Sequence, residues 1–235
     1  QTWFETKQFI KPCFQRKTFY CNFGKNNSDQ TVFLIGDSVM ASMQEELKKN
    51  LMSRNINFIP MTNAGCDFLS KSFDKTKNIF CNAKVQIQRK KKIKEFDKSI
   101  LILHLNYTNI NKDHFEQHID AFLKNIKQYL NSGHIVILLY PIPQWHENVS
   151  KYLDKKYREN KNLFLREIQD PENYIYIGYE NFLKKTKKIS KKFNQLEHEN
   201  LYKLYSHNIF CNNILYDRCL AHSSEEIFVV DGSHL

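Results

Sequence analysis

Short apolar runs of strand length recur along the chain and alternate with stretches of helical periodicity. The first run, 31–35, is almost wholly apolar, which is typical of a strand buried on both faces of a parallel sheet. Further strands are predicted at 55–60, 100–105, 135–140 and 174–177, with a last strand at 227–230. Because strands that alternate with helices build βαβ units, the sequence predicts an α/β fold with a mainly parallel sheet.

Helical periodicity is clearest in two segments between these strands. Residues 38–50 place Val39, Met43 and Leu47 on one face. Residues 113–130 repeat apolar side chains at helical spacing, and Gly133 follows as a helix stop. The inward side chains of that helix are expected to be Phe115, Ile119, Phe122, Ile126 and Leu130.

A further helix is predicted from about Glu180 through the lysine-rich stretch, and residues 196–205 are assigned to the same helical region. The chain has no internal repeat and no linker rich in Pro, Gly or Ser. We therefore expect one domain over 31–235, preceded by an aromatic-rich extension, 1–30, that packs on it.

Composition and charge indicate a globular chain and limit the kinds of molecule that it could bind. With 235 residues, 41% of them hydrophobic, the chain can bury a substantial core. Its formal charge of +10 fits either a solvated surface or attraction to an anionic glycan or phospholipid surface. The basic runs 89–92 and 184–192 lack interleaved aromatic residues, which disfavours nucleic acid. No apolar stretch approaches the roughly 20 residues of a membrane span. Because the chain opens at Gln1, we expect it to be a piece of a longer protein.

Six cysteines fall in three local couples. Short loops with polar borders favour nearest-neighbour disulfides, Cys13–Cys21, Cys66–Cys81 and Cys211–Cys219, among fifteen connectivities. The alternative is six reduced thiols. No Cys-x-x-Cys occurs, so a zinc ribbon is disfavoured. Disulfides would place the chain in an oxidising compartment, the periplasm or the cell exterior.

Residues suited to nucleophilic catalysis stand near the two ends of the chain. Gly36-Asp37-Ser38 follows the first predicted strand, and Asp231-Gly232-Ser233-His234 follows the last. A serine hydroxyl needs an imidazole to take its proton and a carboxylate to orient that imidazole. We therefore predict Ser38 as nucleophile, His234 as general base and Asp231 as orienter. The alternative for Ser38 is an ordinary helix N-cap.

Other polar or aromatic segments also follow predicted strands. Asn106 follows the third strand, and 140–143 follow the fourth. Ligands of open α/β sheets bind beyond the carboxyl ends of the strands, so these segments are expected to converge with Ser38 and His234 on one rim. Tyr140 and Trp145 are candidates for stacking on a sugar ring, with a covering role over the core as the alternative.

Gly-Asp-Ser after an apolar strand, together with Asp-x-x-His near the C-terminus, resembles the SGNH/GDSL hydrolase superfamily. The resemblance implies a flavodoxin-like, three-layer α/β/α domain with a mainly parallel five-stranded sheet. It implies a structural role for Asp37 and an oxyanion hole formed by the backbone of Ser38, the backbone of Gly65 and the side chain of Asn106. The family pattern at the third block is Gly-x-Asn-Asp, whereas this chain reads His104-Leu105-Asn106-Tyr107. Asn63 and Asn109 are the nearby substitutes.

One branch of the superfamily is more similar still, the SGNH domain fused to membrane acyltransferase-3 proteins that O-acetylate lipopolysaccharide O-antigens and other envelope glycans. The matching residues are Gly36-Asp37-Ser38, Gly65-Cys66, the couple Cys211 and Cys219, and 231–235. The resemblance implies an acyl-Ser38 intermediate, transfer to a glycan hydroxyl, and an N-terminal membrane domain that delivers acetyl from acetyl-CoA. It places the domain at the periplasmic face of the inner membrane.

Two other functions remain open at this point. An esterase of the same fold would use water in place of the glycan and keep the same triad. A catalytically inactive glycan-binding module would keep the fold alone. No bound cofactor is expected, and a metal site is disfavoured because His114 and His118, four residues apart, lack a convincing third ligand.

Overall fold

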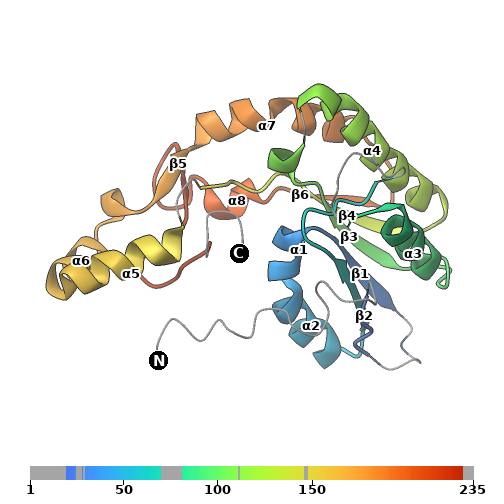
Figure 1. Cartoon of the computed structure of the whole chain (residues 1–235), viewed down its shortest axis with the longest axis horizontal. Helices are drawn as coiled ribbons and strands as arrows, with labels where there is room; N and C mark the ends of the chain where they lie inside the picture. The colour runs from blue at the N-terminus through green and yellow to red at the C-terminus, as the bar shows by residue number, and fades with distance from the viewer. Residues whose placement is uncertain are drawn as a thin grey trace. The chain divides into compact units, whose positions relative to one another are not determined.

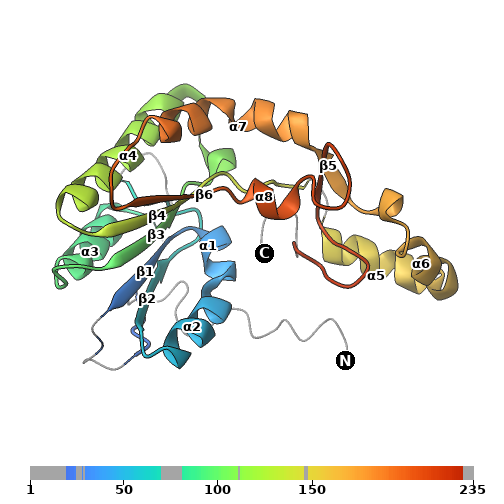
Figure 2. The same ribbon diagram turned by 180° about the vertical axis from the view of Figure 1, so that it is seen from behind.

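Five parallel strands form the central sheet of the computed structural model, which describes residues 20–24, 28, 30–69, 81–110, 112–145 and 148–229 (Figure 1). Their order is β2-β1-β3-β4-β6, and every neighbouring pair is parallel (Figure 2). The predicted α/β fold with a five-stranded parallel sheet is therefore confirmed. The strands are β1 (Thr31–Gly36), β2 (Asn57–Thr62), β3 (Ile100–His104), β4 (Ile135–Leu139) and β6 (Leu201–Leu204).

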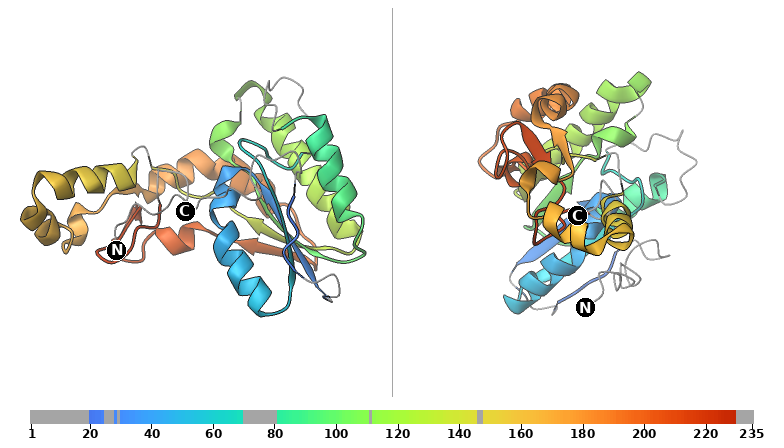
Figure 3. Two further views of the ribbon diagram at one scale, coloured as in Figure 1. Left: turned by 60° about the horizontal axis from the view of Figure 1, so that its bottom comes forward. Right: turned by 90° about the vertical axis from the view of Figure 1, so that its left-hand side faces the viewer.

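Helices cover both faces of this sheet. The helices α1 and α2 lie on one face, and α3 and α4 lie on the other (Figure 3). Every residue of β1 and β2 is buried as a result, which is why their sequences do not alternate between apolar and polar residues. The four helices are α1 (Ser38–Ser42), α2 (Gln44–Ser53), α3 (Ala83–Ile93) and α4 (Phe115–Asn131).

The helix predicted over 38–50 is broken at Met43. The Ser42 hydroxyl donates to the Val39 carbonyl at 2.6 Å, occupying the acceptor that the Met43 N–H would use in a continuous helix. The Met43 N–H bonds instead to the Met40 carbonyl. The chain therefore starts a second helix, α2, whose first turn carries Glu45 and Glu46.

The amphipathic helix predicted over 113–130 is α4, and four of its five expected inward side chains are buried; Phe115 is half-buried. Its C-terminal end is a Schellman motif. Gly133 N–H bonds to the Leu130 carbonyl and His134 N–H to the Tyr129 carbonyl. Gly133 adopts a φ of +85°, so the predicted helix stop is confirmed.

Two of the expected strands lie elsewhere. The segment predicted at 174–177 yields β5 (Tyr176–Gly178), which pairs antiparallel with β7 (Arg218–Leu220) in a separate two-stranded sheet. Ile227 makes only an isolated bridge with His222, and Val230 lies outside the described residues. The fifth strand of the main sheet is β6, from a stretch that the sequence assigned to a helix. Pairing with β4 and alternating burial override that helical pattern.

The chain folds into two compact units. One holds the central sheet and comprises the described residues up to 139 together with 192–204; the other comprises those of 140–191 and 205–229. The sequence, which predicted one domain over 31–235, gave no sign of this division. The second unit contains α5 (Val149–Glu159), α6 (Lys161–Glu167), β5, α8 (His207–Phe210), β7 and most of α7 (Tyr179–Asn194).

Of the expected N-terminal extension, 1–30, the structure describes residues 20–24, 28 and 30. Within the first unit, Phe23 bridges antiparallel to Phe58 at the outer edge of β2. Residues 1–19 lie outside the described residues, so the boundary at 30/31 stays a prediction.

Two disulfides are described, Cys66–Cys81 and Cys211–Cys219, and both follow the nearest-neighbour pairing. Cys13 lies outside the described residues, so its predicted bridge to Cys21 stays a prediction. In the part of the chain that the structure describes, no helix has the length and apolar character that crossing a membrane requires.

We predict that Gly133→Ala lowers the free energy of unfolding by about 1 kcal/mol, because a Cβ disfavours the left-handed backbone at this position. The space itself is open, since no atom lies within 4 Å of the added Cβ. Gly178→Ala is the control, because its φ is ordinary and its closest neighbour is 3.9 Å away. Urea denaturation of both variants checks this, and equal effects would contradict it.

Candidate active site

Ser38 is presented at the carboxyl end of β1. It is the first residue of α1, and it is the only residue of the segment 31–41 that is not buried. Asp37 caps this helix, because its Oδ1 accepts from the Val39 N–H at 3.0 Å. A Cβ on Gly36 would lie 2.5 Å from Met40 Cγ, so the close approach of strand and helix favours glycine there. Strand, glycine and cap together hold Ser38 at an accessible position, as the sequence predicted.

The loop after β2 is tied to the end of β1. The Asn63 N–H donates to the Gly36 carbonyl at 3.1 Å, and a turn closed by the Cys66 N–H to the Asn63 carbonyl follows. Gly65 occupies the third position of this turn with a φ of +57°, and it is exposed. Glycine suits this position because other residues rarely adopt such a φ. The turn therefore places an exposed Gly65 in the loop after β2, and β2 is the neighbour of β1, the strand that precedes Ser38.

Asn106 follows β3, the other neighbour of β1. Its Nδ2 donates to Asp37 Oδ2 at 2.7 Å, and its Oδ1 accepts from the backbone N–H and the hydroxyl of Thr108 at 3.2 and 2.8 Å. Asn106 as a whole is 5% exposed. Ser38, Gly65 and Asn106 thus lie just beyond the carboxyl ends of three adjacent parallel strands, which is the arrangement expected of the predicted oxyanion donors.

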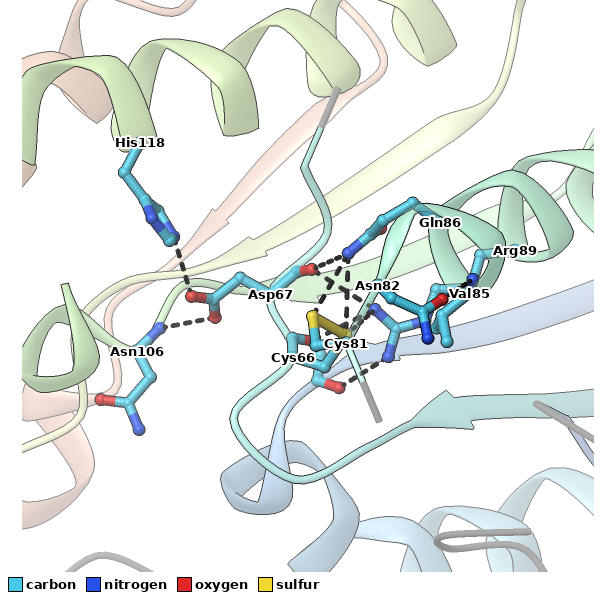
Figure 4. Close-up of a disulfide and its surroundings, with 10 residues drawn as sticks. Cys66, Asp67, Cys81, Asn82, Val85, Gln86, Arg89, Asn106 and His118 are labelled. Carbon is cyan, nitrogen blue, oxygen red and sulfur yellow. Dashed lines mark hydrogen bonds and ion pairs between the residues drawn. A yellow bond between two sulfur atoms is a disulfide. The ribbon is translucent and has the colours of Figure 1, made fainter. Parts of the chain in front are cut away.

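Asp67 joins the loop after β2 to the loop after β3. Its Oδ1 accepts from the Asn106 backbone N–H at 3.2 Å, and its Oδ2 lies 3.0 Å from Nε2 of His118 on α4 (Figure 4). The carboxylate is 5% exposed, whereas the His118 side chain is 18% exposed. His118, considered with His114 as a metal pair, therefore has a carboxylate as its partner instead. Among the described residues no cluster is suited to hold a metal ion.

A fully buried arginine connects the loop after β2 to the end of β1 (Figure 4). Arg89, on α3, donates to the carbonyls of Gly36 and Cys66 at 3.1 Å each and more weakly to that of Asp67. Gln86, one turn earlier, donates to the Asp67 carbonyl at 2.7 Å and contacts both sulfurs of the Cys66–Cys81 bridge. Arg89 therefore belongs to the interior, whereas Lys91 of the same basic run is exposed.

Burial sets the electrostatics of this region. It raises the pKa of Asp37 above the ordinary value, and the neighbouring Asp67 carboxylate raises it further. Burial lowers the pKa of Arg89 to about 10, although Asp67 and Asp37 oppose this shift. Burial also lowers the pKa of His104, whose two ring nitrogens have no hydrogen-bond partner within the described chain. The imidazole of His104 is therefore neutral at pH 7.

Four further residues were predicted to belong to the site, two of them in the triad and two at the substrate rim. Asp231 and His234 lie outside the described residues, so the triad with Ser38 stays a prediction. Tyr140 and Trp145 are 2% and 5% exposed, and the Trp145 indole N–H donates to the Cys219 carbonyl at 3.0 Å. Stacking on a sugar is therefore the wrong interpretation, because neither ring presents an open face. Both cover the core of the second unit.

Comparison with known proteins assigns the family. The family model of the SGNH domain that is fused to AT3 domains matches residues 12–235, so the chain belongs to this family. Among solved structures, the chain is similar to the periplasmic domain of the lipopolysaccharide acetyltransferase of Salmonella ser. Paratyphi A, at a TM-score of 0.60 and 20% identity over 91% of this chain and 79% of that one. At this identity the likeness concerns the fold. No curated protein matches the chain.

We predict that Arg89→Met lowers the free energy of unfolding by about 2–4 kcal/mol, because it leaves buried carbonyls of three residues without this donor. Arg54→Met is the control, since Arg54 is exposed at the end of α2. Its effect should stay within about 0.5 kcal/mol. Chemical denaturation compares the free energies of unfolding of Arg89→Met and Arg54→Met. Similar values would mean that the hydrogen bonds from Arg89 to these carbonyls do not stabilise the fold.

His104 makes stability depend on pH. Its folded-state pKa lies below 6.5, so between 6.5 and that lower value the unfolded chain binds more protons and acidification favours unfolding. His104→Leu should remove this contribution, flattening the stability curve below pH 6.5 by up to about 1.4 kcal/mol per pH unit. Urea melts from pH 7.5 to 5.0 measure the difference, and parallel curves would refute a neutral His104.

Proposed function

We propose that the chain is an O-acyltransferase domain that carries an acyl group on Ser38 and transfers it to a hydroxyl of a cell-envelope glycan, such as a lipopolysaccharide O-antigen. The observation that carries the proposal is the position of Ser38, the one accessible residue of an otherwise buried strand-to-helix junction, in a family fused to AT3 domains. The structural neighbour, a lipopolysaccharide acetyltransferase domain, supports the choice of acceptor class.

The chemistry follows the acyl-transfer scheme. The Ser38 hydroxyl oxygen attacks the acyl carbonyl while His234, oriented by Asp231, takes the hydroxyl proton. The oxyanion accepts hydrogen bonds from the Ser38 and Gly65 backbones and from the Asn106 side chain. Expulsion of the donor's leaving group, which receives that proton, gives acyl-Ser38. A sugar hydroxyl then attacks the acyl carbon, loses its proton to His234 and releases Ser38.

The family supports a proposal for how the acyl group is delivered and where the domain works. We propose that an AT3 membrane domain stands N-terminal to this chain and supplies an acetyl group derived from acetyl-CoA. The domain would then work at the periplasmic face of the bacterial inner membrane. The Cys66–Cys81 and Cys211–Cys219 bridges are consistent with that oxidising compartment. The chain's own chemistry needs no resident cofactor in this scheme.

The first test removes the nucleophile. Ser38→Ala should lower acyl transfer by about 10⁴-fold or more, because the covalent intermediate can no longer form. Ser53→Ala, at an exposed serine of α2, is the matched control and should keep activity. The measurement is hydrolysis of 4-nitrophenyl acetate by the chain, with peptide mass mapping of the acetylated residue. Activity retained by Ser38→Ala would overturn the mechanism.

The acceptor is tested separately in cells that express the chain with its membrane domain. Acetyl groups should appear on the envelope glycan with the native protein and be missing with Ser38→Ala. An esterase would instead reduce glycan acetylation and release acetate. A glycan-binding module would leave acetylation unchanged in both. Either result would contradict the transferase proposal.

A further inference from the structure

Three polar groups of Asn106 each bind a different partner. Its backbone N–H donates to Asp67, its side-chain Nδ2 donates to Asp37, and its side-chain oxygen accepts two hydrogen bonds from Thr108. This pattern fixes the orientation of the carboxamide. A flipped amide would direct its oxygen at the Asp37 carboxylate and its NH2 at the Thr108 N–H, so both contacts would become repulsive.

Asp67 can hold Asn106 in position, because hydrogen bonds fix both the side chain and the backbone of Asp67. Its Oδ2 pairs with His118, and its carbonyl accepts from Gln86 and Arg89. A carboxylate that is 5% exposed costs free energy unless its lone pairs are satisfied. Here both oxygens have partners, one on α4 and the other on Asn106. The carboxylate therefore lies in one fixed place against the Asn106 backbone.

We propose that Asp67 is a positioning residue for the oxyanion donor Asn106, with His118 holding the second oxygen of Asp67 in place. The inference rests on the proposed function, because it assigns Asn106 a part in binding the oxyanion. Asp37 fixes the carboxamide of Asn106, and Asp67 fixes the peptide that carries it. A donor held in advance stabilises the transition state without reorganising during the reaction.

The test uses ester hydrolysis by the full 235-residue chain. Asp67→Ala should lower kcat by about 10- to 100-fold with KM nearly unchanged. The reason is that a displaced Asn106 loses a hydrogen bond to the oxyanion, which forms mainly in the transition state. Asp67→Asn should recover most of the loss, since its amide oxygen still accepts from Asn106. Asp97→Ala, at an exposed aspartate, should have no effect.

A double variant shows whether Asp67 acts through Asn106, because the effects of the two substitutions should then not be additive. If Asp67 works through Asn106, adding Asp67→Ala to Asn106→Ala should cost little beyond Asn106→Ala alone, which itself should cost about 10²- to 10³-fold. Multiplied losses in the double variant would overturn the proposal. Should Asp67→Ala fail to fold, the milder His118→Phe replaces it. His118→Phe should lower kcat by a smaller factor, and it should have no further effect when it is added to Asn106→Ala.

A measurement that needs no catalysis separates this inference from the proposed function. In the Ser38→Ala background, hydrogen exchange at the Asn106 backbone amide should accelerate at least about 10-fold when Asp67 becomes Ala, because the amide loses its acceptor. Unchanged exchange refutes the positioning role even if Ser38 is the nucleophile. If exchange accelerates but Ser38→Ala keeps its activity, Ser38 is not the nucleophile, whereas the hydrogen bond between the Asn106 N–H and Asp67 is confirmed.

Discussion

Two buried carboxylates, Asp37 and Asp67, constrain the part of the molecule around Ser38. Carboxylates taken out of water are stable only when donors surround them, and the donors here come from different segments of the chain. Asn106 supplies one to each. Satisfying both charges therefore requires the loops after β1, β2 and β3 to meet. Arg89 completes this arrangement, because it binds the backbone carbonyls of the first two loops and places a positive charge among the carboxylates.

Much of this could be predicted from local patterns. The apolar run of β1 and the Gly36-Asp37-Ser38 junction predicted the position of Ser38, the proposed nucleophile, because a strand, a tight turn and a helix cap each have a local signature. The amphipathic period of α4 and its Gly133 stop were equally local. The family followed from short motifs in the correct order, and the matching family model confirms it.

The rest depends on contacts between distant residues. The stretch that forms β6 has a helical pattern, and only pairing with β4 makes it a strand. Arg89 stands in a run of lysines, so nothing local separates a buried guanidinium from a solvated one. Asp67 follows Gly65-Cys66 directly, yet its partner His118 is 51 residues away. A sequence pattern cannot show that these two side chains meet.

We propose that the segments after β1, β2 and β3 form one oxyanion site at Ser38. A crystal structure of the chain after Ser38 has reacted with an alkyl fluorophosphonate tests it most directly, because the tetrahedral adduct imitates the intermediate. We expect a phosphonyl oxygen within about 2.7–3.1 Å of the Ser38 nitrogen, the Gly65 nitrogen and Asn106 Nδ2, with Asn106 still bonded to both carboxylates. A phosphonyl oxygen directed away from Gly65 and Asn106 would contradict the account.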